Sequence, residues 1–408
     1  MIFLQLVLVL IVPSPLHGGC KDNKNQSRVE NLSQFKCEKK KGGYLSDTTL
    51  LETYEEAVQS YLNEDWNGCI QGFLNFMSKY KNYKNAVVMC RRKCRIESNT
   101  NIPMFGENIE DLHFYEKSIK QTLCILKCNQ EYRVHAGQNA LKRLSQKQES
   151  KIIFAEYYEY LHICYFQRNN YQEAANAIFT YLIYHPDHKP SKSNLAFYMK
   201  HPEVKNNMIR NLHTEPFIND YIKGIKAYKK EHYDNAVASF ENSIISYIES
   251  EESCRFYCEG PLDYDWNPEF ITAFSNHFVY NLHCKRRCAR FLQSLNGEYQ
   301  QDFLANHFNY LQFSYYQLHD IKMACEAVAS YLLFYPADET MLSNKDYYAS
   351  LPMIKQNDFR PRQDILAYVS RQEYEKRLLL YIHKEFTTFE NNLFASESAS
   401  NQQKQKQK

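Results

Sequence analysis

Eight of the thirteen cysteines in this chain form four Cys-x-x-x-Cys pairs, and this spacing limits the folds that the chain can adopt. On a helix, residues four apart share one face, with their Cβ atoms about 5–6 Å apart. A disulfide needs Cβ atoms about 3.5–4.5 Å apart, so the two cysteines of one pair are not expected to bond to each other. The pairs are Cys90/Cys94, Cys124/Cys128, Cys254/Cys258 and Cys284/Cys288.

Two such helix faces can be joined by two disulfides when the helices pack as an antiparallel hairpin. Eight cysteines permit about 105 connectivities, and helix geometry alone selects among them here. Each outer loop spans about 30 to 40 residues, for which the first bridge would contribute roughly 3–4 kcal/mol and the second bridge less. The predicted bridges are Cys90–Cys128, Cys94–Cys124, Cys254–Cys288 and Cys258–Cys284.

Paired cysteines can also have two other functions. Zinc sites also use cysteines at short spacing, but in an oxidising compartment disulfides are the expected state. A redox-active site would favour Cys-x-x-Cys at a helix start, and the chain has no such motif. Cys69, Cys164 and Cys325 occupy apolar helical positions and are expected to be buried, inert thiols, whereas Cys20 and Cys37 have no assignment.

The N-terminus has the pattern of a secretory signal peptide. An apolar run extends to Val12 and is followed by Pro13, Pro15 and the small residues Gly18 and Gly19, as expected for a cleaved leader. Two Asn-x-Ser sequons follow, at Asn25 and Asn31, and these are candidate glycosylation sites in the same compartment. We therefore expect a lumenal or extracellular protein, with no later stretch apolar enough to span a bilayer.

Composition favours aromatic-rich helices over other classes. The chain has 33 Tyr and 25 Phe but only 11 Gly and 12 Pro in 408 residues, which disfavours turn-rich β folds and collagen-like chains. Its 49 Lys and Arg nearly balance 47 Asp and Glu. No global field would draw the chain to nucleic acid or to an anionic membrane, so a partner has to be recognised by local surface.

The chain contains an internal duplication. Residues 160–198 match residues 310–348 at a shift of 150, and residues 54–73 match residues 221–240 at a shift of 167. The units resemble tetratricopeptide repeats, in which an Asn-Tyr-x-x-Ala turn precedes a helix that carries Ala and an aromatic residue. Asn170 to Ala174 before Phe179, and His232 to Ala236 before Phe240, show this pattern.

Helix pairs of this kind bury their apolar faces only by stacking on neighbours. The predicted fold class is therefore all-α: a tetratricopeptide-like helical repeat solenoid built from two duplicated halves and stapled by disulfides. The expected segments are a signal peptide (1–19), a polar N-terminal segment (20–49), a first helical half (50–212), a second helical half (213–352), a C-terminal helical extension (353–390) and a disordered tail (391–408).

The sequence predicts no catalytic, cofactor-binding or metal-binding residues. His185-Pro-Asp187 is similar to the His-x-Asp ligands of 2-oxoglutarate dioxygenases, but its duplicate is Tyr335-Pro-Ala337, which has neither ligand. Phosphate-binding, nucleophile-elbow and zinc-protease motifs are absent from the sequence. The basic runs 91–93 and 285–287 are expected to be solvated faces opposite the disulfides, although they could equally serve the acidic surface of a partner.

Together these features resemble the leprecan family. The leader, the duplicated halves and the cysteine pairs are joined by Tyr310-Leu-Gln-Phe-Ser-Tyr-Tyr316, by Ser330-Tyr-Leu-Leu-Phe334 and by Phe359-Arg-Pro-Arg362 before a final helix. The resemblance covers roughly residues 50 to 385. Family enzymes, the collagen prolyl 3-hydroxylases, carry this helical region ahead of a dioxygenase domain, and the family also has non-catalytic members that consist of the helical region alone.

The resemblance implies a non-enzymatic scaffold, without a cofactor, in the lumen of the endoplasmic reticulum. Its implied partners are a prolyl 3-hydroxylase, a prolyl isomerase of the cyclophilin B type and unfolded procollagen chains. Three alternatives remain open at this point: a paralogous leprecan scaffold that acts with a lysyl hydroxylase on collagen, a thiol–disulfide exchange chaperone, and a part of a full hydroxylase.

Overall fold

The computed structural model describes residues 49–136, 146–260 and 269–406, all of which belong to one compact unit. The expected signal peptide, most of the polar N-terminal segment, Cys20, Cys37 and both sequons, at Asn25 and Asn31, lie outside the described residues. No helix within the described part is long and apolar enough to cross a membrane.

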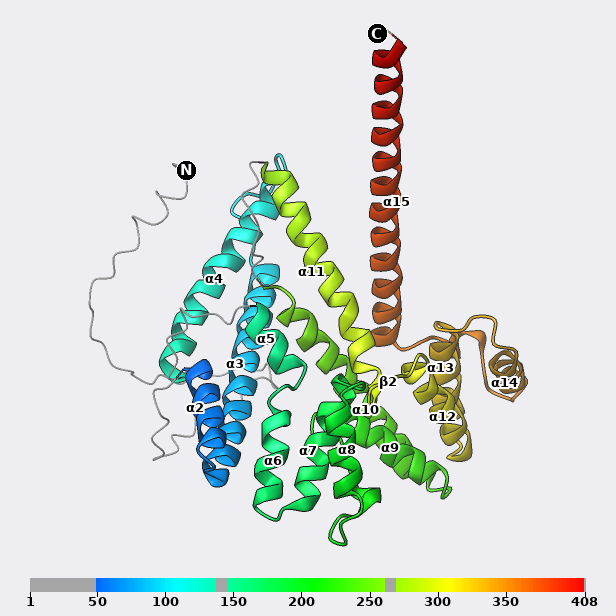
Figure 1. Ribbon diagram of the computed structural model, residues 1–408. Coiled ribbons are helices and arrows are strands. Elements are labelled where there is room, and N and C mark those ends of the chain that lie inside the picture. The colour runs from blue at the N-terminus through cyan, green and yellow to red at the C-terminus, as the bar shows by residue number, and fades with distance from the viewer. Residues whose placement is uncertain (1–48, 137–145, 261–268, 407–408) are drawn as a thin grey trace, which may run out of the picture. The chain divides into compact units, whose positions relative to one another are not determined.

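The described chain is helical almost throughout, which confirms the predicted fold class (Figure 1). Within the described residues the β-structure is limited to a two-residue antiparallel ladder in which Ser294 pairs with Tyr299. In chain order the elements of the first half are α2 (Leu50–Leu62), α3 (Trp66–Thr100), α4 (Leu112–Ala136), α5 (Gln146–Ile153), α6 (Tyr158–Gln167), α7 (Tyr171–Tyr184), α8 (Lys189–Tyr198) and the 3₁₀ turn η1 (Asn206–Met208).

The second half repeats this order. Its elements are α9 (Pro216–Tyr228), α10 (Tyr233–Tyr257), α11 (Phe270–Leu292), β1 (Ser294–Leu295), β2 (Glu298–Tyr299), α12 (Phe303–Gln317), α13 (Ile321–Leu332), α14 (Glu339–Ala349), the 3₁₀ turn η2 (Gln356–Asp358) and α15 (Gln363–Lys406).

The same turn chemistry joins the helices of each repeat pair. The residue that ends the turn has a left-handed backbone, with φ near +60° at Glu64, Asn169, Glu231 and His319. An N-cap side chain then starts the next helix in several repeats. The Asn170 side-chain oxygen accepts a hydrogen bond from the Glu173 N–H. Asp320 caps α13 and Asp65 caps α3 in the same way. Such caps satisfy backbone donors that the first turn of a helix leaves unpaired.

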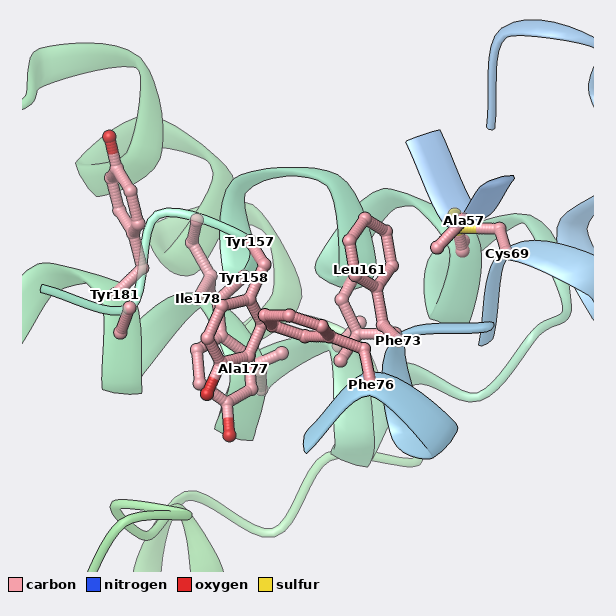
Figure 2. Close-up of a cluster of buried hydrophobic side chains, with 14 of the residues drawn as sticks. Ala57, Cys69, Phe73, Phe76, Tyr157, Tyr158, Leu161, Ala177, Ile178 and Tyr181 are labelled. Atoms are coloured by element: carbon pink, nitrogen blue, oxygen red, sulfur yellow. A yellow bond between two sulfur atoms is a disulfide. The ribbon is translucent and has the colours of Figure 1, made fainter. Parts of the chain in front are cut away.

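Each half has its own aromatic core, and the two cores share a stacked pair of Phe and Tyr at equivalent positions. In the first half Phe73 stacks on Tyr160 with ring centroids 6.1 Å apart, and Figure 2 shows Phe73 among the buried side chains of that core. In the second half the equivalent Phe240 stacks on Tyr310 at 5.1 Å. Large aromatic rings supply most of the buried apolar area that holds such helix pairs together.

The prediction for Cys69 and Cys164 is wrong, because the two residues form a disulfide between α3 and α6 with Cα atoms 6.4 Å apart. Both side chains are fully buried, as predicted, but they meet across 95 residues of sequence. Apolar spacing places a cysteine in a core without identifying its neighbour there. The duplicated positions carry Ala236 and Ser314, so the second half lacks this bridge. Cys325 is a buried free thiol.

The expected boundary of a disordered tail at residue 391 also differs from the structure, in which α15 continues without a break to Lys406. No glycine or proline follows Pro361. Ala, Glu, Gln and Lys are good helix formers, and extending an existing helix avoids the cost of nucleating a new one. The polar composition of this tail therefore does not interrupt the helix that precedes it.

Replacing Gly224 with alanine should destabilise the second half. A Cβ atom at Gly224 would lie 2.8–2.9 Å from three ring carbons of Phe240, which is fully buried. Overpacking costs about 1–3 kcal/mol and alanine regains about 1 kcal/mol of helix propensity, so we expect a net loss of up to about 2 kcal/mol in urea unfolding. Gly106→Ala is the control, because no atom lies within 4 Å of its new Cβ. Equal stabilities of the two variants would contradict the close packing of α9 on α10.

Stability should also fall at mildly acid pH. Burial lowers the pKa of His162 and of His307 to about 4, whereas an unfolded histidine titrates near 6.5. Between pH ~4 and pH ~6.5 the unfolded chain binds more protons than the folded chain. The free energy of unfolding therefore keeps its full value only above pH ~6.5. Below that pH it should decrease by about 1.4 kcal/mol per pH unit for each histidine.

Urea unfolding between pH 7.5 and pH 5 measures this slope. The variants His307→Gln and His162→Gln should each show a shallower slope than the parent chain. A parent slope that both variants preserve would mean that other groups carry the pH dependence.

Candidate functional site: the two disulfide hairpins

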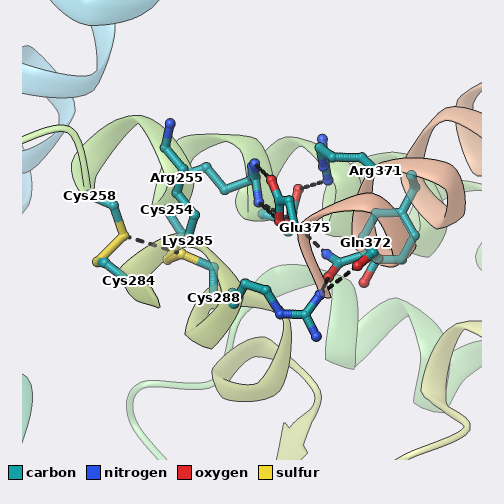
Figure 3. Close-up of polar contacts among 12 residues, drawn as sticks. Cys254, Arg255, Cys258, Cys284, Lys285, Cys288, Arg371, Gln372 and Glu375 are labelled. Carbon is teal, nitrogen blue, oxygen red and sulfur yellow. Dashed lines mark hydrogen bonds and ion pairs between the residues drawn. A yellow bond between two sulfur atoms is a disulfide. The ribbon is translucent and has the colours of Figure 1, made fainter. Parts of the chain in front are cut away.

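Two disulfide bridges hold each of two antiparallel helical hairpins together. In the α3–α4 hairpin Cys90 bonds Cys128 and Cys94 bonds Cys124. In the α10–α11 hairpin Cys254 bonds Cys288 and Cys258 bonds Cys284, as Figure 3 shows. The Cα–Cα distances of the four bridges lie between 5.5 and 5.9 Å. These are the same four bridges that helix geometry selects from the sequence.

The bridged sulfurs are not thiolates, so in this form they neither bind zinc nor attack another disulfide. Within the described residues, the one group with metal-binding proximity is Cys254, Cys258 and Cys288, and all three are in disulfides. A cysteine binds metal or attacks a disulfide as the thiolate. The remaining described thiol, Cys325, has its pKa raised to about 11 by burial and, secondarily, by Asp358, so little thiolate forms at neutral pH.

The prediction that the first basic run is a solvated face is wrong, because this run joins the two halves. The Arg91 guanidinium donates to the backbone oxygens of Phe256 and Tyr257, at 2.8 and 2.7 Å. These carbonyls are at the C-terminal end of α10, where a cation satisfies unpaired acceptors and the helix dipole. The Arg92 guanidinium also pairs with Glu252 at 2.9 Å. Within this run only Lys93 behaves as expected, because its side chain is 57% exposed.

An acidic residue just after α10 links two basic side chains of the hairpins. Glu259 pairs with Arg95 of α3 and with Lys285 of α11, and the Arg95 guanidinium also lies 5.0 Å from the centre of the Phe256 ring. The Lys285 pKa is lowered by burial, against which Glu259 acts. Lys285, the first residue of the second basic run, therefore also belongs to the contact between the halves and is not a solvated side chain.

A buried polar contact extends the junction to α5. The hydroxyl groups of Tyr257 and Tyr80 both donate to the Glu149 carboxylate, the latter at 3.4 Å. Burial is the main reason that the pKa values of both phenols are raised, so both tyrosines remain donors at neutral pH. The contact ties α10 of the second half to α3 and α5 of the first half.

The second hairpin holds α15 through a second set of charges. Arg255 pairs with Glu375, and the Arg371 guanidinium pairs with Glu251 at 2.7 Å (Figure 3). Glu251 is 1% exposed. Burial raises its pKa, whereas Arg371 and Arg255 act to lower it. The Arg286 guanidinium completes this contact by donating to the backbone oxygen of Gln372 at 2.6 Å.

The polar junctions were not predicted from the sequence, although one signal for them exists. Glu251 continues the buried face of α10 that runs through Phe240, Ile244 and Tyr247 at helical spacing. A carboxylate on such a face needs a cationic partner, because an isolated buried charge is very costly. The pattern could have identified Glu251 as an ion-pair site, but not Arg371 as its partner.

Aromatic side chains at the distal ends of the two hairpins also meet. The rings of Phe114 and Phe274 pack edge to face with centroids 5.5 Å apart, and Tyr115 lies 6.1 Å from Phe270. Phe114 and Phe274 are equivalent positions, 160 residues apart in the duplication. The hairpins are thus in contact at α3–α10 and again at α4–α11, which orients one against the other.

The outer faces of α4 and α11 differ in chemistry. On α4, Leu123 and Leu126 are 43% and 53% exposed. On α11, a cleft of about 430 Å³ is lined by His283, Arg286, Arg287, Arg290 and, from α15, Leu379. The same disulfide framework therefore presents an apolar face in the first half and a basic face in the second.

His185 and Asp187 do not form a metal site. The Nε2 atom of His185 contacts the Phe154 carbonyl oxygen at 2.9 Å, and its ring stacks on Tyr181 with centroids 4.4 Å apart. Asp187 is exposed in the turn after α7. The His-x-Asp segment thus has a structural role at the end of a repeat helix.

Comparison with known proteins connects this arrangement to one family. Residues 49–351 match the leprecan family TPR-like repeat region. Prolyl 3-hydroxylase 1 from Homo sapiens is 28% identical over 383 residues, covering 88% of this chain and 50% of that protein. Prolyl 3-hydroxylase 2 from Gallus gallus is 28% identical over 337 residues, covering 80% and 48%.

Cartilage-associated protein from Mus musculus is 26% identical over 339 residues, which cover 81% of this chain and 82% of that protein. The chain therefore spans about half the length of the prolyl 3-hydroxylases that it matches, but most of the length of cartilage-associated protein.

The contact between the two hairpins predicts that Arg91→Met destabilises the protein. Methionine keeps an apolar stem but leaves the Phe256 and Tyr257 carbonyls without their charged donor, a loss of about 1.5–3 kcal/mol. Urea unfolding measures the change. Lys93→Met, two residues away on an exposed position, should change stability by less than about 0.5 kcal/mol. A similar small effect at both positions would show that Arg91 is not important for joining the halves.

Proposed function

Because this chain belongs to the leprecan family, we propose that it is a non-catalytic helper subunit of a complex that 3-hydroxylates prolines of unfolded procollagen. In this proposal the catalytic subunit is a prolyl 3-hydroxylase, and a prolyl isomerase of the cyclophilin B type is a third component. The chain would stabilise the hydroxylase and help to present unfolded collagen chains. The proposed site of action is the lumen of the endoplasmic reticulum.

The observation that carries the proposal is the extent of the match to cartilage-associated protein. That relative is matched over 82% of its length, whereas the prolyl 3-hydroxylases are matched over about half of theirs. The family match falls within the helical repeat region that the described residues form. The role proposed for this chain is therefore that of the helical repeat region.

The physical character of the described residues suits a scaffold. Five disulfides and two sets of partly buried ion pairs restrict movement of the described helices relative to one another. A protein whose relative helix positions are fixed in advance loses less conformational entropy when it binds a partner. Stacked helical repeats also provide extended binding surfaces, and cysteines held in disulfides suit an oxidising lumen.

The proposal can be tested by reconstitution. The purified chain is mixed with a recombinant prolyl 3-hydroxylase and a heat-unfolded procollagen fragment. We expect the hydroxylase to co-elute with the chain in gel filtration, and mass spectrometry should detect more 3-hydroxyproline than with the hydroxylase alone. The matched control is the same chain after reduction and alkylation, which lacks its disulfides and should give neither effect.

Three outcomes would contradict the proposal. If the chain alone produced 3-hydroxyproline, it would be a catalyst. If hydroxylation of proline were unchanged while a lysyl hydroxylase gained activity, the chain would serve lysine modification instead. If the chain reduced the disulfides of insulin in the presence of a thiol donor, it would be an exchange catalyst, which the burial of Cys325 argues against.

A further inference from the structure

The cleft between α11 and α15 has a concentration of basic side chains, of which the fold uses only a part. His283, Arg286, Arg287 and Arg290 occur at the spacing i, i+3, i+4, i+7 on α11, which places them on one face of the helix. Within the described residues none of the four forms an ion pair. His283, Arg287 and Arg290 are exposed, and Leu379 of α15 adds an apolar wall.

The acidic groups nearest in sequence on α15 already have cationic partners. Glu373 pairs with Arg377 at 2.9 Å, and Glu375 pairs with Arg255. Arg286 donates to the Gln372 backbone oxygen, and the Arg290 guanidinium lies 5.8 Å from the centre of the Tyr299 ring. Neither contact neutralises the charge. Arg286 also helps to lower the pKa of Glu373, after Arg377, so Arg287 and Arg290 are the cations of the cleft without a carboxylate partner among the described residues, and Leu379 adds an apolar side chain.

The duplication shows that this charge is not needed to build a hairpin. Cys124 and Cys128 stand 160 positions before Cys284 and Cys288, so the residues equivalent to the four basic ones can be assigned directly. They are Leu123, Leu126, Lys127 and Gln130. The α3–α4 hairpin has the same two disulfides with a single cation on this face. The basic face thus serves something other than the hairpin fold.

We propose that the α11–α15 cleft binds an acidic, extended segment of a partner protein. The four side chains span eight residues of helix, and the seven steps of about 1.5 Å between them make about 10 Å, which three or four residues of extended chain would span. Guanidinium groups bind carboxylates through paired hydrogen bonds. Leu379 adds a place for an apolar side chain between the acidic ones. Charge complementarity of this kind supplies orientation and specificity to an interface.

The test measures binding of a rhodamine-labelled peptide, Glu-Glu-Leu-Glu-Glu-Leu, to the purified full chain by fluorescence anisotropy. The matched peptide Gln-Gln-Leu-Gln-Gln-Leu has the same length and the same leucines without the charge. We expect the acidic peptide to bind and the amide peptide not to bind. Affinity should fall about fivefold for Arg287→Ala and again for Arg290→Ala, with a decrease at higher salt.

The control variant is Lys127→Ala, which changes the position on α4 that is equivalent to Arg287. It should bind the acidic peptide as the parent chain does. Because Arg287 and Arg290 are exposed, both variants should keep the circular dichroism and melting temperature of the parent chain, so that a loss of affinity reports on the cleft.

Several outcomes would overturn the inference. Equal weakening by Lys127→Ala and Arg287→Ala would mean that binding follows overall charge. Binding of the amide peptide with the same affinity would remove the role of the carboxylates. Complete displacement of the peptide by millimolar inorganic phosphate at constant ionic strength would assign the cleft to small anions. None of these measurements depends on the proposed hydroxylase partner.

Discussion

The disulfides stabilise the parts of the structure in which hydrophobic burial is insufficient. The C-terminal part of α3 extends beyond the aromatic core, and the buried cluster between it and α4 consists of Cys90, Cys94 and Cys128, with Cys124 and Ile125 beside them. A helix pair with so little apolar contact is not expected to be stable by packing alone. The covalent bridges replace that missing core, and the contacts that the hairpins make with other elements depend on their being held in place.

Each half uses the residue after its first paired cysteine to hold the next part of the chain. Arg91, which follows Cys90, binds the end of α10, and Arg255, which follows Cys254, binds Glu375 of α15. The duplicated position thus has the same task in both halves but different acceptors, backbone carbonyls in one and a carboxylate in the other. Stacked repeats gain stability from such neighbour contacts, and here the contacts are largely electrostatic.

Divergence between the halves marks where specific recognition could have developed. The repeat cores are conserved between the halves as stacked pairs of Phe and Tyr, whereas the exposed faces of α4 and α11 have become apolar and basic, respectively. Changes on a solvated face cost little stability, so a duplicated scaffold can acquire two different binding surfaces.

The amino-acid sequence by itself determined the helical class, the duplication and the four hairpin disulfides. These follow from short-range rules: the helical period, the turn chemistry at residues such as Asn170, and the i, i+4 geometry of paired cysteines. The same local rules extend α15 to Lys406, although low complexity alone indicated disorder there.

Only the tertiary structure decided the Cys69–Cys164 bridge, the role of Arg91 and the pairing of Glu251 with Arg371. Each of these contacts joins residues that are distant in sequence. They lie on elements whose relative position depends on how the repeats stack. A single sequence shows that a cysteine, an arginine or a glutamate lies on a given helix face. It does not show which face of another helix is opposite, because many stackings satisfy the same apolar pattern.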